Sequence, residues 1–179
     1  ACPLNFAMRA FFLLLSAVAA LKYSQVIGPA IQYTLTWDPP AQGQASMCIS
    51  AQINASNWIA LGFRAPGLTE MNGTDIVVGF ATADGRVFVK TMYSNDTEGY
   101  PGGVNTLQVS ATSFARVGKV TSLCFTRLIS SGHVSLTDST SVIWGTGPVL
   151  NDDLDYHGAD NNDPTGKTQT HRSDAIPPI

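Results

Sequence analysis

Short apolar segments separated by turn residues run through most of the chain. They are rich in Val, Ile, Thr, Phe and Trp, and after residue 22 none keeps the 3.6-residue period of an amphipathic helix. Asp84-Gly85, between two of them, predicts a tight hairpin. Many short strands at this spacing predict an all-β protein, an antiparallel β-sandwich. The expected strands are Tyr33–Trp37, Met47–Ile53, Trp58–Phe63, Ile76–Ala81, Val87–Tyr93, Leu107–Ala111, Val120–Phe125 and Val142–Trp144.

The first apolar segment predicts a targeting signal instead of a strand. Met8-Arg9 provides a start and a positive charge, and the apolar run Ala10–Leu21 contains the cleavage pattern Ala17-Val18-Ala19. We expect residues 1–20 to be a signal peptide, with residues 1–7 upstream of its start; the alternative is a buried helix. The run is too short to cross a bilayer, so membrane association would require a further C-terminal region.

Composition narrows the function. The chain has 179 residues, 44% of them hydrophobic, which suits one globular domain with a core. Only 13% are charged and the net charge is −3, which argues against a nucleic-acid partner. We expect a sandwich over residues 21–160 and a polar tail or linker over 161–179. The segment 151–163 is acidic, with Asp152, Asp153, Asp155, Asp160 and Asp163.

Secretion changes the interpretation of the cysteines and asparagines. Cys2 precedes the expected cleavage site, so Cys48 and Cys124 remain as an even pair, which predicts one disulfide in an oxidising compartment. The alternative is two free buried thiols. Three N-x-S/T triplets at turn-like positions are candidate glycosylation sites: Asn54, Asn72 and Asn95.

Several motifs in order resemble one family. Trp58-Ile59-Ala60-Leu61-Gly62-Phe63, Met71-Asn72-Gly73-Thr74-Asp75 and Gly85-Arg86-Val87-Phe88-Val89 are followed by Cys124-Phe125-Thr126-Arg127, Val142-Ile143-Trp144-Gly145 and Tyr156-His157. Together they resemble the DOMON domain over about residues 30–160. The resemblance implies an immunoglobulin-like β-sandwich. It also implies haem b binding, as in the members that hold the iron between a loop Met and a His near the end of the domain.

On this resemblance, Met71 and His157 fall on the two iron-ligand positions. A thioether and an imidazole are a known axial pair in electron-transfer cytochromes, and with both positions filled the iron has no open site for O₂. The competing donors are His133, in a hairpin-like turn, and His171, in the tail. Candidates to line or support the haem pocket are Phe63, Tyr93 and Trp144, together with Trp58 and Phe80.

The resemblance therefore predicts a secreted cytochrome domain that transfers single electrons and is not a stand-alone enzyme. Its partner would be a redox protein or a small electron donor or acceptor, and the acidic segment around residues 151–163 would attract a positively charged one. The alternative is a haem-free DOMON sandwich that binds carbohydrate or a protein outside the cell.

Overall fold

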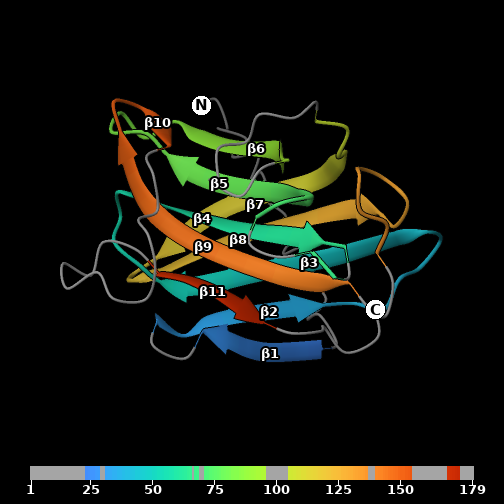
Figure 1. Ribbon diagram of the computed structural model, residues 1–179. Helices are drawn as coiled ribbons and strands as arrows, with labels where there is room; N and C mark the ends of the chain where they lie inside the picture. The colour runs from blue at the N-terminus through green and yellow to red at the C-terminus, as the bar shows by residue number, and fades with distance from the viewer. Residues whose placement is uncertain are drawn as a thin grey trace, which may run out of the picture.

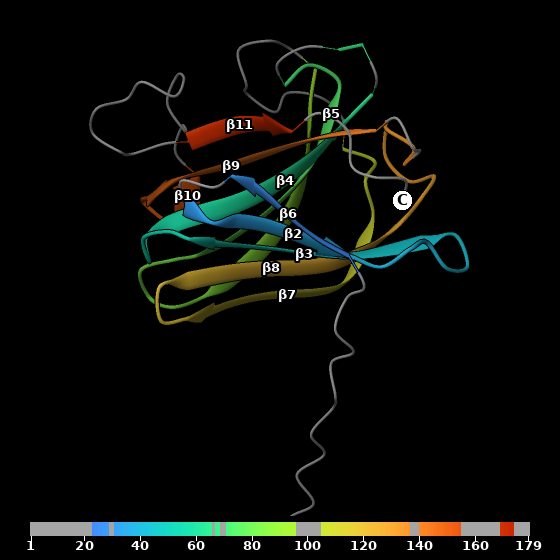
Figure 2. The same cartoon turned by 90° about the horizontal axis from the view of Figure 1, so that it is seen from below.

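Two antiparallel β-sheets stacked in layers form the protein (Figures 1 and 2). The computed structural model describes residues 23–28, 31–65, 67–68, 71–95, 105–136 and 140–154, and of 169–173 the backbone alone. The first sheet contains, in spatial order, β1 (Tyr23–Gly28), β2 (Tyr33–Trp37), β3 (Gln44–Gln52), β8 (Val120–Leu128) and β7 (Val109–Val117). The second contains β10 (Asp153–Leu154), β9 (Ser141–Leu150), β4 (Asn57–Arg64), β5 (Thr74–Ala81) and β6 (Val87–Ser94), with β11 (Gln169–Ser173) also paired to β9.

The main core lies between the two sheets. Strands β2, β3 and β8 alternate between buried and half-buried residues, as expected for strands with one face on a core. From the second sheet, Leu61, Phe63 and Trp144 point toward them, and the ring of Phe63 meets that of Phe125 edge to face at 6.2 Å. The Tyr33 hydroxyl donates to the Ala60 carbonyl and so links β2 to β4 directly.

The second sheet is buried on both faces, unlike the first. In β4 and β5 nearly every residue is buried, so these strands are continuous apolar runs in the sequence. Residues that alternate with Leu61 and Phe63 point away from the main core and form a second apolar cluster. This outer face is where the candidate site lies.

The predicted disulfide is present. Cys48 and Cys124 face each other across β3 and β8, with their sulfur atoms 2.04 Å apart. Their separation of 76 residues means that the link closes a long loop, which contributes about 4–5 kcal/mol in the chain-entropy account. It fits an oxidising compartment.

Each of the eight predicted strands falls on a strand of the structure, and the Asp84-Gly85 hairpin is confirmed, with Gly85 at φ 84°. Three strands were not predicted: β1, β10 and β11. Strand β11 lies within 161–179, where the sequence predicted a polar tail. The expected signal peptide lies outside the described residues. None of the described segments forms a helix long and apolar enough to cross a membrane.

Candidate functional site

An apolar cluster covers the outer face of the second sheet. Its alternation follows from strand geometry, because Trp58 and Ala60 on β4 point to the opposite side from Leu61 and Phe63. Small residues, Ala60 and Gly62, occupy the middle of β4, and larger side chains from β5 stand beside them. We call this group the outer cluster; its members are Trp58, Ala60, Ile76, Val78 and Phe80, with Met71, Phe88, Met92, Val149 and Leu154 packed against them.

Met71 reaches the outer cluster from the turn that precedes β5. The turn Met71-Asn72-Gly73 depends on glycine, because Gly73 has a φ of 66° and a Cβ there would collide with Leu68. Met71 is half-buried and packs against the outer cluster. At the start of β5, Thr74 is fully buried, and among the described residues its hydroxyl has no hydrogen-bond partner. The turn thus places a thioether and a polar atom at one end of an apolar face.

A buried ionic anchor holds the end of this turn in place. Asp75 is fully buried, and its carboxylate accepts hydrogen bonds from the backbone N–H groups of His133 (3.1 Å) and Val134 (2.7 Å). Arg127, on β8, donates to the carbonyls of Ser131 (2.5 Å) and Val134 (2.6 Å), and its guanidinium carbon lies 4.6 Å from the centre of the Phe63 ring. The anchor therefore ties the Met71 turn to the loop after β8.

The charge state of Arg127 follows from these contacts. Burial lowers its pKa to about 10, and the charge of Asp75 opposes part of that fall. Arg127 therefore stays protonated at neutral pH. Sequence reasoning missed the anchor, although a carboxylate directly before the apolar run Ile76–Phe80 was a signal for it.

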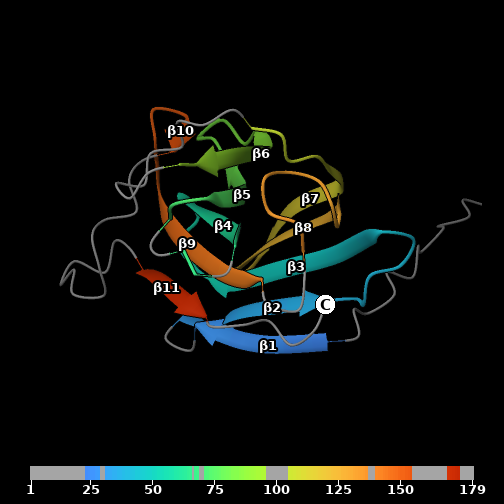
Figure 3. The ribbon, with the colours of Figure 1, turned by 45° about the vertical axis from the view of Figure 1, so that its right-hand side comes forward.

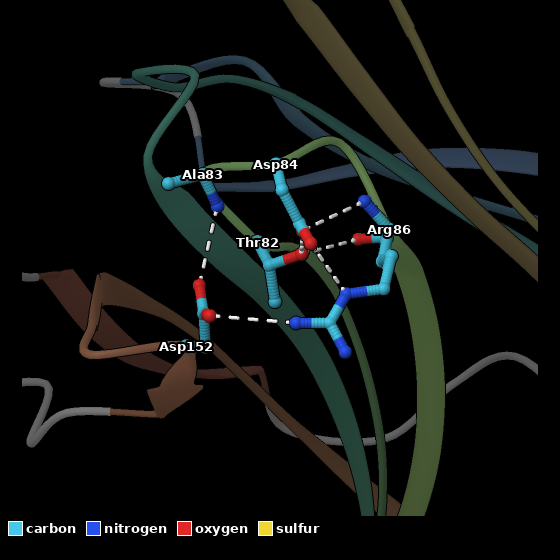
Figure 4. A network of polar contacts seen from close by, with 5 residues as sticks. All are labelled: Thr82, Ala83, Asp84, Arg86 and Asp152. Carbon is cyan, nitrogen blue, oxygen red and sulfur yellow. Dashed lines mark hydrogen bonds and ion pairs between the residues drawn. The ribbon is translucent and has the colours of Figure 1, made fainter.

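At the opposite end of the outer face, polar contacts join two hairpins (Figure 4). Asp152 lies on the turn between β9 and β10, where it and Asn151 both have positive φ (63° and 51°), as a type I′ hairpin turn requires. Its carboxylate accepts a hydrogen bond from the Ala83 N–H (3.3 Å) and lies 3.5 Å from the Arg86 guanidinium. On the other side of that guanidinium, the Asp84 Oδ2 atom lies 2.7 Å from the Arg86 Nε atom.

A second ion pair lies beside the first. Lys90, on β6, is 3.4 Å from Asp153, on β10. The two cations also cover aromatic rings of the outer face: Lys90 lies 5.0 Å from the centre of Phe80, and Arg86 lies 5.7 Å from that of Phe88. We call this set of contacts the latch; it consists of Ala83, Asp84, Arg86 and Lys90 on one side and Asp152 and Asp153 on the other.

The latch connects opposite edges of the sheet. In the strand order, β10 and β6 are the first and last members, yet the latch brings them together, with β9 sweeping from β11 toward β10 (Figure 3). The second sheet is therefore curled at this end. Leu154 and Val149 thereby pack onto the outer cluster.

Not all of the predicted pocket residues lie on this face. Phe63 and Trp144 belong to the main core, because their strand positions point inward; Trp144 packs against Tyr33 at 4.3 Å between ring centres. Tyr93 stacks on His133 at 3.7 Å, beside the Asp75 anchor. The other two aromatic candidates, Trp58 and Phe80, do belong to the outer cluster.

His157, the second predicted ligand, lies outside the described residues, as does the side chain of His171. The described stretch before it ends at Leu154, which packs onto the outer cluster. Of the acidic segment, Asp152 and Asp153 form ion pairs with Arg86 and Lys90 in the latch. Among the candidate glycosylation sites, Asn54 and Asn95 are exposed and Asn72 is half-buried.

The donor chemistry of the outer face fits a haem as far as it is described. A porphyrin needs an apolar surface and soft or nitrogen axial donors. The members of the outer cluster are apolar, and Met71 packs its thioether against them.

Comparison with known proteins agrees with this fold. The DOMON domain family matches residues 31–147. Among solved structures, the cytochrome domain of cellobiose dehydrogenase from Myriococcum thermophilum is similar, with a TM-score of 0.51 and 14% sequence identity, over 85% of this chain and 80% of that one. No curated protein sequence matches the chain significantly. An identity this low shows likeness of fold alone, whereas the family match spans most of the chain. The protein belongs to the DOMON domain family.

Proposed function

We propose that this secreted DOMON domain binds haem b between Met71 and His157 and transfers single electrons to and from a redox partner. The observation that carries the proposal is the position of Met71: an anchored turn holds its thioether against an apolar face. The family match supports it, as does likeness in fold to a protein named a cytochrome domain.

Each group on the outer face would have a distinct part in binding. When bound, haem supplies a one-electron couple at its iron. Met71 would be the axial donor that favours the reduced iron and raises the potential, and His157 the second donor. The outer cluster would exclude water from the porphyrin edge. With both Met71 and His157 holding the iron, little room would remain for O₂ to bind it, which would favour electron transfer over oxygen chemistry.

A second methionine provides a matched control. Met92, on β6 opposite Ile76, also packs against the outer cluster, but it lies within a strand and not on a turn. Leucine replaces either methionine with little change in volume, so packing losses should be small in both. Met71→Leu removes the proposed ligand, whereas Met92→Leu removes only a packing contact.

The test is the visible spectrum of purified protein loaded with haemin. We expect a Soret band and, on reduction, sharp α and β bands in the wild type and in Met92→Leu. Met71→Leu and His157→Ala should each abolish the low-spin spectrum. A wild-type protein that stays colourless with haemin refutes haem binding and favours a haem-free sandwich for carbohydrate or protein. Sharp bands in both ligand variants would show that the axial residues are misassigned.

A further inference from the structure

The outward side of the first sheet carries no charged residue. Strands β1, β2, β3, β8 and β7 contain two charged residues, Arg127 and Arg116, and both point to the inner side. Arg127 belongs to the buried anchor, and Arg116 donates to the hydroxyl of Thr121, a buried residue that it faces in the ladder (3.1 Å). About a quarter of the residues of a soluble protein are charged, and most of these lie on its surface. A five-stranded face without charge is therefore unusual.

Small uncharged side chains occupy this side of the sheet instead. We call it the hydroxyl face; its middle consists of Ser46, Cys48 and Ser50 on β3 and of Ser122, Cys124 and Thr126 on β8. All six alternate with core residues and are half-buried. The disulfide lies at the centre, because β3 and β8 are inner strands of the sheet and each cysteine is at the middle of its strand. Small side chains make a flat surface, which suits packing against a second sheet.

Exposed apolar residues lie around these hydroxyls. Val117 is 80% exposed, Val26 57%, Leu128 42% and Val120 38%. Strand alternation places all four on the hydroxyl face: Val120 and Leu128 have the same parity on β8 as Cys124, Val117 pairs with Val120, and Val26 pairs with a half-buried threonine of β2. Exposed apolar side chains together with an absence of charge are typical of the centre of a protein–protein interface.

Three hydroxyls of the face are already bonded within it. The Ser46 and Thr126 hydroxyls lie 2.9 Å apart, and the Thr36 hydroxyl donates to the Cys48 carbonyl (3.3 Å). A hydroxyl bonded within its own sheet loses little when water leaves, whereas a surface that holds a hydroxylated ligand needs free donors and acceptors. These contacts favour another protein surface as the partner.

We infer that the hydroxyl face is the contact surface between two copies of this chain, packed face to face about a two-fold axis that passes over the disulfide. A face without charge is complementary to itself, because no like charges meet when its own copy covers it. Three strands of nine residues and two shorter ones give it an area of roughly 600 Å². The dimer buries roughly 1,200 Å² in total, the lower limit for a stable interface. The inference does not depend on haem binding.

The test is sedimentation velocity of the full chain from micromolar to millimolar concentration. We expect a reversible monomer–dimer equilibrium, weak because the face has no aromatic anchor. Ser122→Lys introduces a charge two residues from Cys124, close to the axis, and should weaken dimerisation by about tenfold or more. Ser122→Asp should do the same, and an equimolar mixture of the two variants should restore the dimer. A wild type that stays monomeric throughout, or a mixture that does not associate, overturns the inference.

A matched control separates this face from a general effect of charge. Ala83→Lys adds the same charge on an exposed turn of the second sheet and should dimerise like the wild type. Equal weakening by Ala83→Lys and Ser122→Lys contradicts the inference. The unfolding midpoint checks that Ser122→Lys folds; if it does not, Ser50→Lys takes its place, because Ser50 faces Ser122 in the ladder.

The disulfide provides a readout that needs no substitution. Dithiothreitol reduces such a bond when its thiolate attacks one sulfur and displaces the other, and both protein cysteines become thiols as the reagent closes its own disulfide. Cys48 and Cys124 are half-buried in the single chain, and a second copy covers them. Reduction of the wild type should slow about tenfold from dilute to dimeric protein, and Ser122→Lys should show no such dependence. A wild-type rate that does not change with protein concentration overturns the inference.

Discussion

Replacing Asp75 with alanine should destabilise the domain strongly, because Asp75 is the acceptor of a buried anchor. The change removes the carboxylate that binds the backbone N–H groups of His133 and Val134 and that faces Arg127. It leaves two buried or part-buried backbone N–H groups without their acceptor, at about 1–3 kcal/mol each, and removes the negative charge that favours the protonated Arg127. For a domain of this size, about 4 kcal/mol lowers Tm by about 8–16 °C.

The assay is guanidinium unfolding followed by tryptophan fluorescence, which reports both the midpoint and the slope m. Asp75→Asn keeps one oxygen acceptor and should lose roughly half as much stability. The double variant Asp75→Ala/Arg127→Met should lose less than the sum of its single changes, since no unpaired charge remains. Lys119→Gln should leave the midpoint unchanged. A cost below about 1 kcal/mol for Asp75→Ala, or full additivity in the double variant, would refute the anchor.

Two further predictions concern the disulfide and acid stability. Cys48→Ser/Cys124→Ser should lower the unfolding free energy by about 2–5 kcal/mol, measured by the same denaturation; no change would show that the link does not restrict the unfolded chain. The Leu154 N–H, and after it Lys90, lower the pKa of Asp153 below its usual 3.8. The stability that the ionised carboxylate contributes is therefore complete above about pH 5 and disappears as the pH falls through the lowered pKa. Asp153→Asn should therefore show a smaller loss of stability in acid than the wild type, and equal acid curves would contradict this.

Sequence patterning succeeded where burial is regular. In β2 and β3 the alternation of apolar and polar residues is the direct result of one buried face, so their positions could be predicted. The pattern predicted the strands at the edges of the sheets less completely. Most of β7 is exposed, and its register shifts between Ser110 and Ser113, so only its first residues were predicted. Strand β10 has two residues, too few to show any period.

The site was predictable only in part, for a related reason. The turn that carries Met71 could be predicted because its motif is local in sequence. Which face of the sheet an aromatic residue occupies depends on strand register, which the sequence does not display: Phe63 and Trp144 lie in the main core, whereas Trp58 and Phe80 lie in the outer cluster. The latch joins Arg86 to Asp152, residues 66 positions apart, and no local pattern marks such a pair. The curl of the sheet, which a sequence does not display, brings them together.

The most direct measurement of the central claim is the reduced-minus-oxidised visible spectrum of haemin-loaded protein, compared between Met71→Leu and Met92→Leu. Both methionines pack against the outer cluster, so the packing lost on replacement by leucine should be similar, and ligation to iron is the difference that the comparison tests. Haem ligation by Met71 predicts sharp low-spin bands in the wild type and Met92→Leu and their loss in Met71→Leu. Identical spectra in the two variants, or no haem spectrum in the wild type, would contradict it.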